Sequence, residues 1–373
     1  MPVKMLNFHI YFGVLVLFLL TGCGGEFSVD PPLSCSLSIA STLYRPVKLG
    51  ASSDPEFVWS PNGQHIAYRN SQGKIFVLQN VIEDKEKAQQ RFIGTGRGLS
   101  WSADGSKITY VTRSENTNAV MVIDTSSGES IRLVEDENPL FPPVWSTASE
   151  AFVFTDRTES HSMTLVLGNT GSYLQDDWRV LTESEFGEDI HVYSWSPDGN
   201  RLLFEKIAAG EDTNLYTYNL NSNAERLVTE SSGCEEEGVW SPDSESVAFS
   251  SNYNGNWDIF VASVAEDGKL NNLTNSQVPQ EFYPTWSVIQ NQIVFVSYHS
   301  YSDTEFSQDL FLIDPEGKNL LRLTSSPEIE TFPVWSPGGP HLAYLSLDGA
   351  KWSINIAKIE NNQLLPIYSI PVD

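Results

Sequence analysis

"FVWSPNGQHIAY", residues 57–68, is one of seven copies of a short pattern in this chain of 373 residues. Each copy contains a Trp-Ser pair, and the successive tryptophans are 42, 44, 50, 45, 46 and 49 residues apart. A repeat with a period of about 45 residues is the signature of an architecture built from stacked units. The seven repeat tryptophans are Trp59, Trp101, Trp145, Trp195, Trp240, Trp286 and Trp335.

Each repeat contains the signals of four short strands. A few alternating residues end in Trp-Ser, and Pro-Asp-Gly or a similar sequence then makes a tight turn in which Gly supplies a positive φ. Further strand-like segments follow, such as residues 247–250 (VAFS) and 258–261 (DIFV), and a last one carries Arg-Leu-Thr, as at 322–324. Four antiparallel strands per repeat of this length predict an all-β, seven-bladed β-propeller.

The repeat Pro-x-Trp-Ser-Pro-Asp-Gly…Ile-Ala-Phe…Asp-Ile-Tyr-Val…Arg-Leu-Thr resembles the TolB-type, WD-like propeller repeat, over about residues 41–373. This family includes the periplasmic TolB protein, propeller domains of serine peptidases and many lipoproteins. TolB itself has six blades and an N-terminal α/β domain. Here seven motifs are present and a short linker precedes them, so the resemblance implies the fold and argues against a Tol-Pal role.

The N-terminus has the pattern of a lipoprotein signal peptide. An apolar run over residues 10–20 would rise only about 16 Å as a helix, too little to cross about 30 Å of hydrocarbon. It ends in Leu20-Thr21-Gly22-Cys23, which resembles a bacterial lipobox and implies cleavage before Cys23 and lipidation of that residue. Gly24 rather than Asp follows, which favours the outer membrane if the organism has one and otherwise the cell surface.

Three segments follow from these patterns: a signal peptide at 1–22, a flexible tether at 23–40 and the propeller at 41–373. Removing residues 1–22 takes away one of 22 basic side chains and none of 48 acidic ones, so the mature net charge is 21 − 48 = −27. Such a chain repels nucleic acid, which we exclude as a partner. We expect a monomer.

Closure of the ring allows two alternatives. Arg45 lies 14 residues before Trp59, the spacing that separates a fourth strand from the next repeat, so residues near 43–49 could complete the last blade. The segment 363–372 (QLLPIYSIPV) could instead be the fourth strand of that blade, although Pro366 and Pro371 weaken it. We favour closure by the N-terminal segment, which would join the first and last blades.

Most candidate chemical groups have a structural explanation. One repeat tryptophan per blade at a fixed register indicates packing between blades, so only Trp178, Trp257 and Trp352 are free to contact a ligand. The histidines show no zinc-binding spacing, and His65 and His341 are expected to be exposed after the first turn. Pairing of Cys35 with Cys234 is permitted in an exported protein and stays open.

One group of carboxylates exceeds expectation. Five residues before each repeat tryptophan, where the innermost strand begins, four of seven positions are acidic, whereas about one is expected from 48 acidic residues in 373. They are Asp54, Glu235, Glu281 and Glu330, in adjacent blades, and Glu188, Asp189, Glu236 and Glu237 lie nearby in sequence. We predict that this face binds a cation, either Ca²⁺ or a Lys/Arg-bearing segment of a partner. The alternative is a solvated acidic rim.

The sequence favours a non-catalytic binding scaffold in the cell envelope, with a protein, peptide or glycan as its ligand and no cofactor other than possible calcium. The alternative is a propeller-type polysaccharide lyase or glycosidase. Close carboxylates with shifted pKa values beside an aromatic residue would favour the enzyme.

Overall fold

A computed structural model of the chain describes residues 55–82, 88–114, 117–136, 141–157, 163–169, 178–185, 188–207, 213–229, 233–265, 269–277, 279–300 and 306–372. Cys23, Cys35, Asp54 and the predicted tether lie outside these residues. The described residues contain no helix, and so none that is long and apolar enough to span a membrane.

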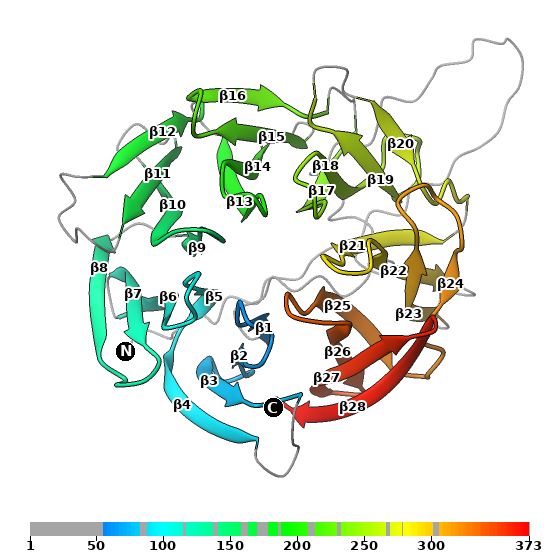
Figure 1. Cartoon of the computed structure of the whole chain (residues 1–373), viewed down its shortest axis with the longest axis horizontal. Helices are drawn as coiled ribbons and strands as arrows, with labels where there is room; N and C mark the ends of the chain where they lie inside the picture. Colours follow the sequence, from blue (N-terminus) through cyan, green and yellow to red (C-terminus); the bar gives the residue numbers. More distant parts are fainter. Residues whose placement is uncertain are drawn as a thin grey trace, which may run out of the picture. The chain divides into compact units, whose positions relative to one another are not determined.

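Twenty-eight strands form seven antiparallel sheets of four, and Figure 1 shows the sheets arranged around a centre. Four sheets come from the first part of the chain. The first holds β1 (Glu56–Trp59), β2 (Ile66–Arg69), β3 (Lys74–Gln79) and β4 (Gln89–Thr95), and the second β5 (Arg97–Trp101), β6 (Lys107–Arg113), β7 (Asn118–Asp124) and β8 (Ser130–Asp136). The third holds β9 (Val144–Trp145), β10 (Ala151–Arg157), β11 (Met163–Asn169) and β12 (Arg179–Glu183), and the fourth β13 (Asp189–Trp195), β14 (Arg201–Ile207), β15 (Thr213–Asn219) and β16 (Ala224–Leu227).

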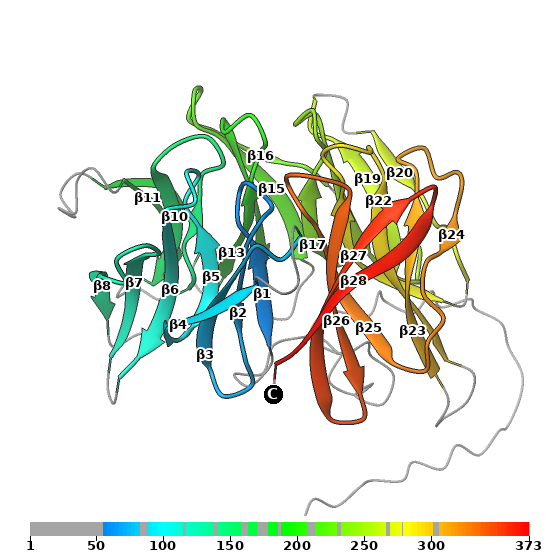
Figure 2. The same ribbon diagram turned by 60° about the horizontal axis from the view of Figure 1, so that its bottom comes forward.

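The other three sheets complete the ring. The fifth holds β17 (Glu235–Trp240), β18 (Ser246–Ser251), β19 (Asp258–Ser263) and β20 (Leu270–Asn272), and the sixth β21 (Gln280–Trp286), β22 (Ile293–Ser300), β23 (Phe306–Ile313) and β24 (Leu321–Arg322). The seventh holds β25 (Ile329–Trp335), β26 (His341–Asp348), β27 (Lys351–Glu360) and β28 (Gln363–Pro371). The predicted seven-bladed propeller is confirmed, and the first strand of every blade lies nearest the centre (Figure 1). Figure 2 shows the blades in a tilted view.

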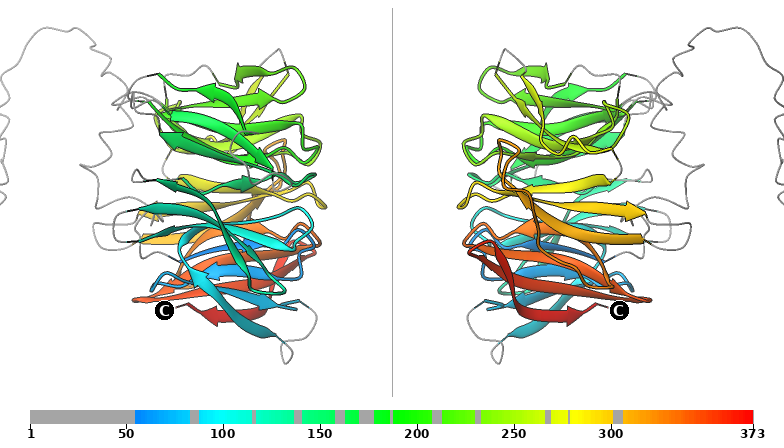
Figure 3. Two further views of the ribbon diagram at one scale, coloured as in Figure 1. Left: turned by 90° about the vertical axis from the view of Figure 1, so that its left-hand side faces the viewer. Right: turned by 90° about the vertical axis from the view of Figure 1, so that its right-hand side faces the viewer.

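Hydrophobic clusters lie between neighbouring blades, as predicted from the repeat tryptophans. All seven tryptophans are buried, and the indole N–H groups of three of them donate to a first strand of the preceding blade. Trp59 donates to the Val334 carbonyl at 3.1 Å, Trp101 to the Val58 carbonyl at 3.3 Å, and Trp195 to the Val144 carbonyl at 3.0 Å. The tryptophans therefore hold neighbouring blades together. Figure 3 shows the blades in side view.

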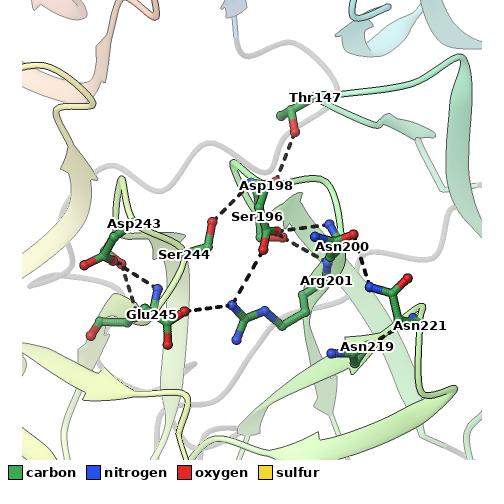
Figure 4. Close-up of polar contacts among 12 residues, drawn as sticks. Thr147, Ser196, Asp198, Asn200, Arg201, Asn219, Asn221, Asp243, Ser244 and Glu245 are labelled. Atoms are coloured by element: carbon green, nitrogen blue, oxygen red, sulfur yellow. Dashed lines mark hydrogen bonds and ion pairs between the residues drawn. The ribbon is translucent and has the colours of Figure 1, made fainter.

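The serine of the Trp-Ser pair supports the first turn of the blade. In the fourth blade the Ser196 hydroxyl donates to the Asp198 carboxylate at 2.5 Å and accepts from the Arg201 N–H at 2.9 Å (Figure 4). The same turn contacts the next blade, because the Asp198 N–H donates to the Ser244 hydroxyl at 3.1 Å and Arg201 lies 3.5 Å from Glu245. Polar turns thus join the blades on this face while the indoles join them in the core.

The preferred closure by residues 43–49 is wrong, because the fourth strand of the last blade is β28. Pro366 and Pro371 are tolerated for two reasons. β28 is the outer strand, and its register against β27 shifts by one residue at Ile367, next to Pro366, while Pro371 is its last residue. The first and last blades are instead held by side-chain packing and by a hydrogen bond of 3.1 Å from the Ser71 N–H to the Val372 carbonyl.

Candidate functional site

The predicted carboxylates lie where the first strands of three adjacent blades begin, and they are buried. Glu235, Glu281 and Glu330 expose 1%, 3% and 3% of their surface. Asp54, the fourth member of the predicted group, lies outside the described residues. A solvated acidic rim is therefore the wrong interpretation for the three that are described.

Hydroxyl groups that follow the fourth strand of the preceding blade satisfy these carboxylates. Thr229 donates to Glu235 at 3.0 Å, Ser276 donates to Glu281 at 2.9 Å, and Thr324 donates to Glu330 at 3.2 Å. Thr229 and Thr324 are each six residues before the glutamate they contact. The excess of Glu at this register thus has a structural explanation, which is to join each blade to the link that enters it.

Burial keeps two of these groups protonated over much of the pH range. Burial raises the pKa of Glu281 to about 9, against hydrogen bonds from Ser276, and the Asp258 carboxylate raises it further. Burial likewise raises the pKa of Glu330 to about 7. Near neutral pH, Glu281 is therefore a neutral acid that can donate to Asp258, which is a poor ligand for a cation.

Among the described residues, no three His, Cys, Asp or Glu side chains are grouped so that they could hold a metal ion. Glu235, Glu281 and Glu330 therefore do not form a metal site between them. Calcium binding would need ligands from elsewhere in the chain and stays a prediction.

A second polar arrangement, which the sequence analysis missed, joins the first strands of the fourth and fifth blades. We call His191, Tyr193, Glu205 and Glu237 the inner polar chain. His191 Nδ1 lies 3.2 Å from Glu205, the Tyr193 hydroxyl donates to Glu205 at 2.5 Å, and the Tyr193 oxygen accepts from the Glu237 N–H at 2.8 Å. Burial raises the pKa of Tyr193 well above its usual value, and Glu205 raises it further, so the phenol remains a donor.

The inner polar chain reaches solvent at one end. The His191 side chain is 50% exposed, whereas that of Glu205 is only 8% exposed. Glu236 and Glu237 are half-buried beside it on β17, and Glu188 and Asp189 are half-buried at the start of β13. Among the described residues of this face, these side chains therefore offer accessible charge, whereas the three buried glutamates do not.

The position of Glu205 breaks the repeat. It lies ten residues after its repeat tryptophan, and the seven residues at this register are all buried. Five of them are uncharged: Val111, Thr155, Ser250, Val296 and Leu345. Only Arg69 and Glu205 are ionisable there. A charge at a buried strand position was the signal that could have identified both residues from sequence.

Three first strands also carry strained backbone at one register. Glu237, Tyr283 and Phe332, each three residues before its repeat tryptophan, have φ values of 63°, 55° and 50°. The second blade has Gly98 at this register, with φ 69°. Left-handed backbone costs a non-glycine residue about 1–2 kcal/mol, so contacts made by these three side chains must offset the strain. Two such contacts join adjacent blades: Glu237 accepts from the Tyr283 N–H at 2.5 Å, and the centroids of the Tyr283 and Phe332 rings are 4.1 Å apart.

The other candidate residues are mostly structural. Trp178, Trp257 and Trp352 pack against the hydrophobic clusters between blades, so the prediction that they are free to contact a ligand is not supported. His65 and His341 are half-buried rather than exposed. Cys234 is buried and takes part in a disulfide, and Cys35, whose pairing with it the sequence left open, lies outside the described residues.

Comparison with known proteins supports the family resemblance. Residues 182–310 match the TolB beta propeller domain. The Tol-Pal system protein TolB of Francisella tularensis is 24% identical over 224 residues, which cover 59% of this chain and 48% of that protein. The chain spans about half the length of the curated relatives it matches.

Two solved structures share the fold at 12% sequence identity. Oligogalacturonate lyase from Vibrio parahaemolyticus has a TM-score of 0.64, with 83% of this chain and 93% of that chain covered. The β-propeller domain of the trilobed protease from Pyrococcus furiosus, reported to have an open velcro topology, has a TM-score of 0.60, with 84% and 98% covered. These likenesses concern the fold alone. The domain match over residues 182–310 and the TolB relatives support the resemblance of these repeats to the TolB-type propeller repeat.

Proposed function

We propose that this protein is a non-catalytic binding propeller that holds a cationic segment of an envelope protein against the first strands of its fourth and fifth blades. The observation that carries the proposal is the inner polar chain, in which the buried carboxylate of Glu205 is joined to an exposed histidine. Half-buried Asp189 and Glu236 add negative charge beside it. Half-buried carboxylates attract Lys and Arg side chains, and this attraction mainly raises the rate of association.

Export and lipidation at Cys23 complete the proposal. The likeness to TolB propellers is consistent with an exported protein, and two or three acyl chains on Cys23 would give lasting attachment to a membrane. The propeller would then present its binding face to proteins of the envelope. A Tol-Pal role is not part of the proposal, since the curated TolB relatives are matched over only about half their length.

Capture of a partner tests this function. The full chain is crosslinked in its native envelope, and the protein it captures is purified and titrated against wild type and the double variant Asp189→Asn, Glu236→Gln. We expect binding that weakens as salt rises and weakens again in the double variant. Glu316→Gln, which removes one exposed carboxylate from the β23–β24 turn, is the matched control and should bind as wild type. Binding that is insensitive to salt and to the double variant would contradict the proposal.

One observation favours an enzyme as the second candidate. A histidine held by a buried carboxylate, as His191 is by Glu205, is an arrangement that can take a proton from a substrate. Glu281, next to Asp258, has the raised pKa expected of a catalytic carboxyl group, but both side chains are buried. Incubation with acidic polysaccharides, followed by the absorbance of unsaturated products, tests a lyase. An activity that His191→Gln abolishes would replace the binding proposal.

A further inference from the structure

A cleft of about 580 Å³ opens between the first and second blades, away from the inner polar chain. It lies where β2 ends, β5 begins and β6 ends, next to the link from β4 to β5. Its volume falls within the range of roughly 300–1,000 Å³ that is typical of small-molecule sites. Its lining includes Arg69, Gln72, Arg97, Thr112, Arg113 and Asn118.

Three arginines meet in this cleft from three different strands. Arg69 is the last residue of β2, Arg97 the first of β5 and Arg113 the last of β6. Arg69 is only 6% exposed, whereas Arg97 and Arg113 are exposed. One guanidinium thus lies deep in the cleft and two lie near its mouth.

The charge of the cleft is opposite to that of the chain. The sequence has 48 acidic and 22 basic residues, yet the ten described residues that line the cleft include three arginines and no Asp or Glu. Among the described residues, Glu56 lies nearby: it is opposite Arg69 in the register of β1 and β2, and its carboxylate accepts the Gly98 N–H at 2.7 Å. Burial raises the pKa of Glu56, and the positive charges of Arg69 and Arg97 act in the opposite direction.

The other lining groups can donate hydrogen bonds. Gln72, Thr112 and Asn118 carry amide or hydroxyl donors. Within the part of the chain that the structure describes, neither Arg97 nor Arg113 donates a side-chain hydrogen bond to another residue. The planar guanidinium fork suits an oxyanion, which accepts two parallel hydrogen bonds from it.

We infer that this cleft is a binding site for a small ligand bearing an oxyanion, a carboxylate or a phosphate, held between Arg97 and Arg113 with Arg69 beneath. The ligand is small because a chain with a net charge of −26 repels extended polyanions such as nucleic acid. A small anion experiences mainly the local field of the three arginines. None of these residues belongs to the inner polar chain, so the inference stands or falls independently of the proposed function.

Titration of the full chain with two probes tests the site. Citrate represents carboxylates and inorganic phosphate represents phosphates, and isothermal titration calorimetry measures binding of each. The variants are Arg97→Gln and Arg113→Gln, both at exposed positions. Arg132→Gln is the matched control, because Arg132 is exposed in the same blade, contacts Glu135 and lies outside the cleft. Circular dichroism of each variant verifies its fold.

We expect wild type and Arg132→Gln to bind at least one probe at a single site and to be stabilised by it against heat. Each cleft variant should weaken that binding by about tenfold or more, since each removes a charge-assisted hydrogen-bonding group. The probe that binds more tightly identifies the oxyanion. The inference is overturned if neither probe binds at about 10 mM. It is equally overturned if Arg132→Gln weakens binding as much as the cleft variants do.

Discussion

Replacement of Glu281 by Gln should remove a large part of the pH dependence of stability. Glu281 is 3% exposed, its pKa is raised to about 9 mainly by burial, and the ordinary value is 4.5. Between these values the unfolded chain has lost the proton that the native chain retains. Stability from this group is therefore full below about pH 4.5 and is lost as the pH rises toward 9.

The magnitude follows from the linkage relation. The free energy of unfolding of wild type should fall by about 1.4 kcal/mol per pH unit from this group, and by about 6 kcal/mol over the whole interval. Gln cannot ionise, and its amide can donate to Asp258 while its oxygen accepts from Ser276, as the protonated acid does. From pH 5 to pH 8, the free energy of unfolding of the variant should therefore rise by about 4 kcal/mol relative to that of wild type.

Urea denaturation at a series of pH values measures this difference. Glu316→Gln, at an exposed position, is the control and should follow wild type at every pH. Parallel curves for wild type and Glu281→Gln would refute the reasoning, because they would mean that Glu281 is ionised in the native state. A positive charge would then be needed beside the buried Glu281 carboxylate. Stabilisation of wild type but not of Glu281→Gln by Ca²⁺ would support the predicted cation site.

Other expected results follow from separate features of the chain. Cys23→Ser should release the protein from membranes or leave an uncleaved precursor, which fractionation and mass spectrometry detect; an unmodified N-terminus elsewhere in the wild type would contradict the lipobox. Deletion of β28 should expose the edge of the last blade and lower the melting temperature or cause aggregation, whereas deletion of residues 41–50 should have a much smaller effect on the melting temperature. Gly98→Ala should destabilise the fold by about 2 kcal/mol or more in denaturant titrations, since φ is 69° and a Cβ would lie 2.0 Å from the Pro142 ring. Equal stability of this variant would show that β5 can move away from that proline.

The number and arrangement of blades could be predicted because each Trp-Ser pair acts within its own repeat and at the interface with a neighbouring blade. The tryptophan fills one interface and the serine supports one turn, so the pattern recurs wherever the geometry does. Closure could not be predicted in this way. Arg45 matches a local spacing, but the alternative strand tolerates Pro366 only because the register shifts beside it, and pairing across strands determines that shift.

Glu235, Glu281 and Glu330 lie at the strand ends where the sequence places them, but the sequence did not predict their burial. Their spacing from the tryptophans fixed the strand end at which they lie, whereas burial depends on the link from the preceding blade. Thr324 was visible in the repeat as part of Arg-Leu-Thr, and Thr229 follows Arg226-Leu227 by two residues, yet only the structure joins Thr324 to Glu330. When one residue type recurs at a given position of each repeat, a structural partner should therefore be sought first among the residues that recur at other positions of the repeat.

This distinction separates packing from function in a ring of repeats. Geometry that recurs in each blade requires the same residues each time, so the tryptophans, the turn serines and even the buried glutamates are explained by contacts between blades. A charged side chain that occurs once at a register otherwise filled by Val, Thr, Ser or Leu has no such explanation. Arg69 and Glu205 are the two such residues at the buried register ten positions after the tryptophan. One lies in the cleft between the first and second blades and the other in the inner polar chain, which is why these two places, of opposite charge, are where binding should be sought.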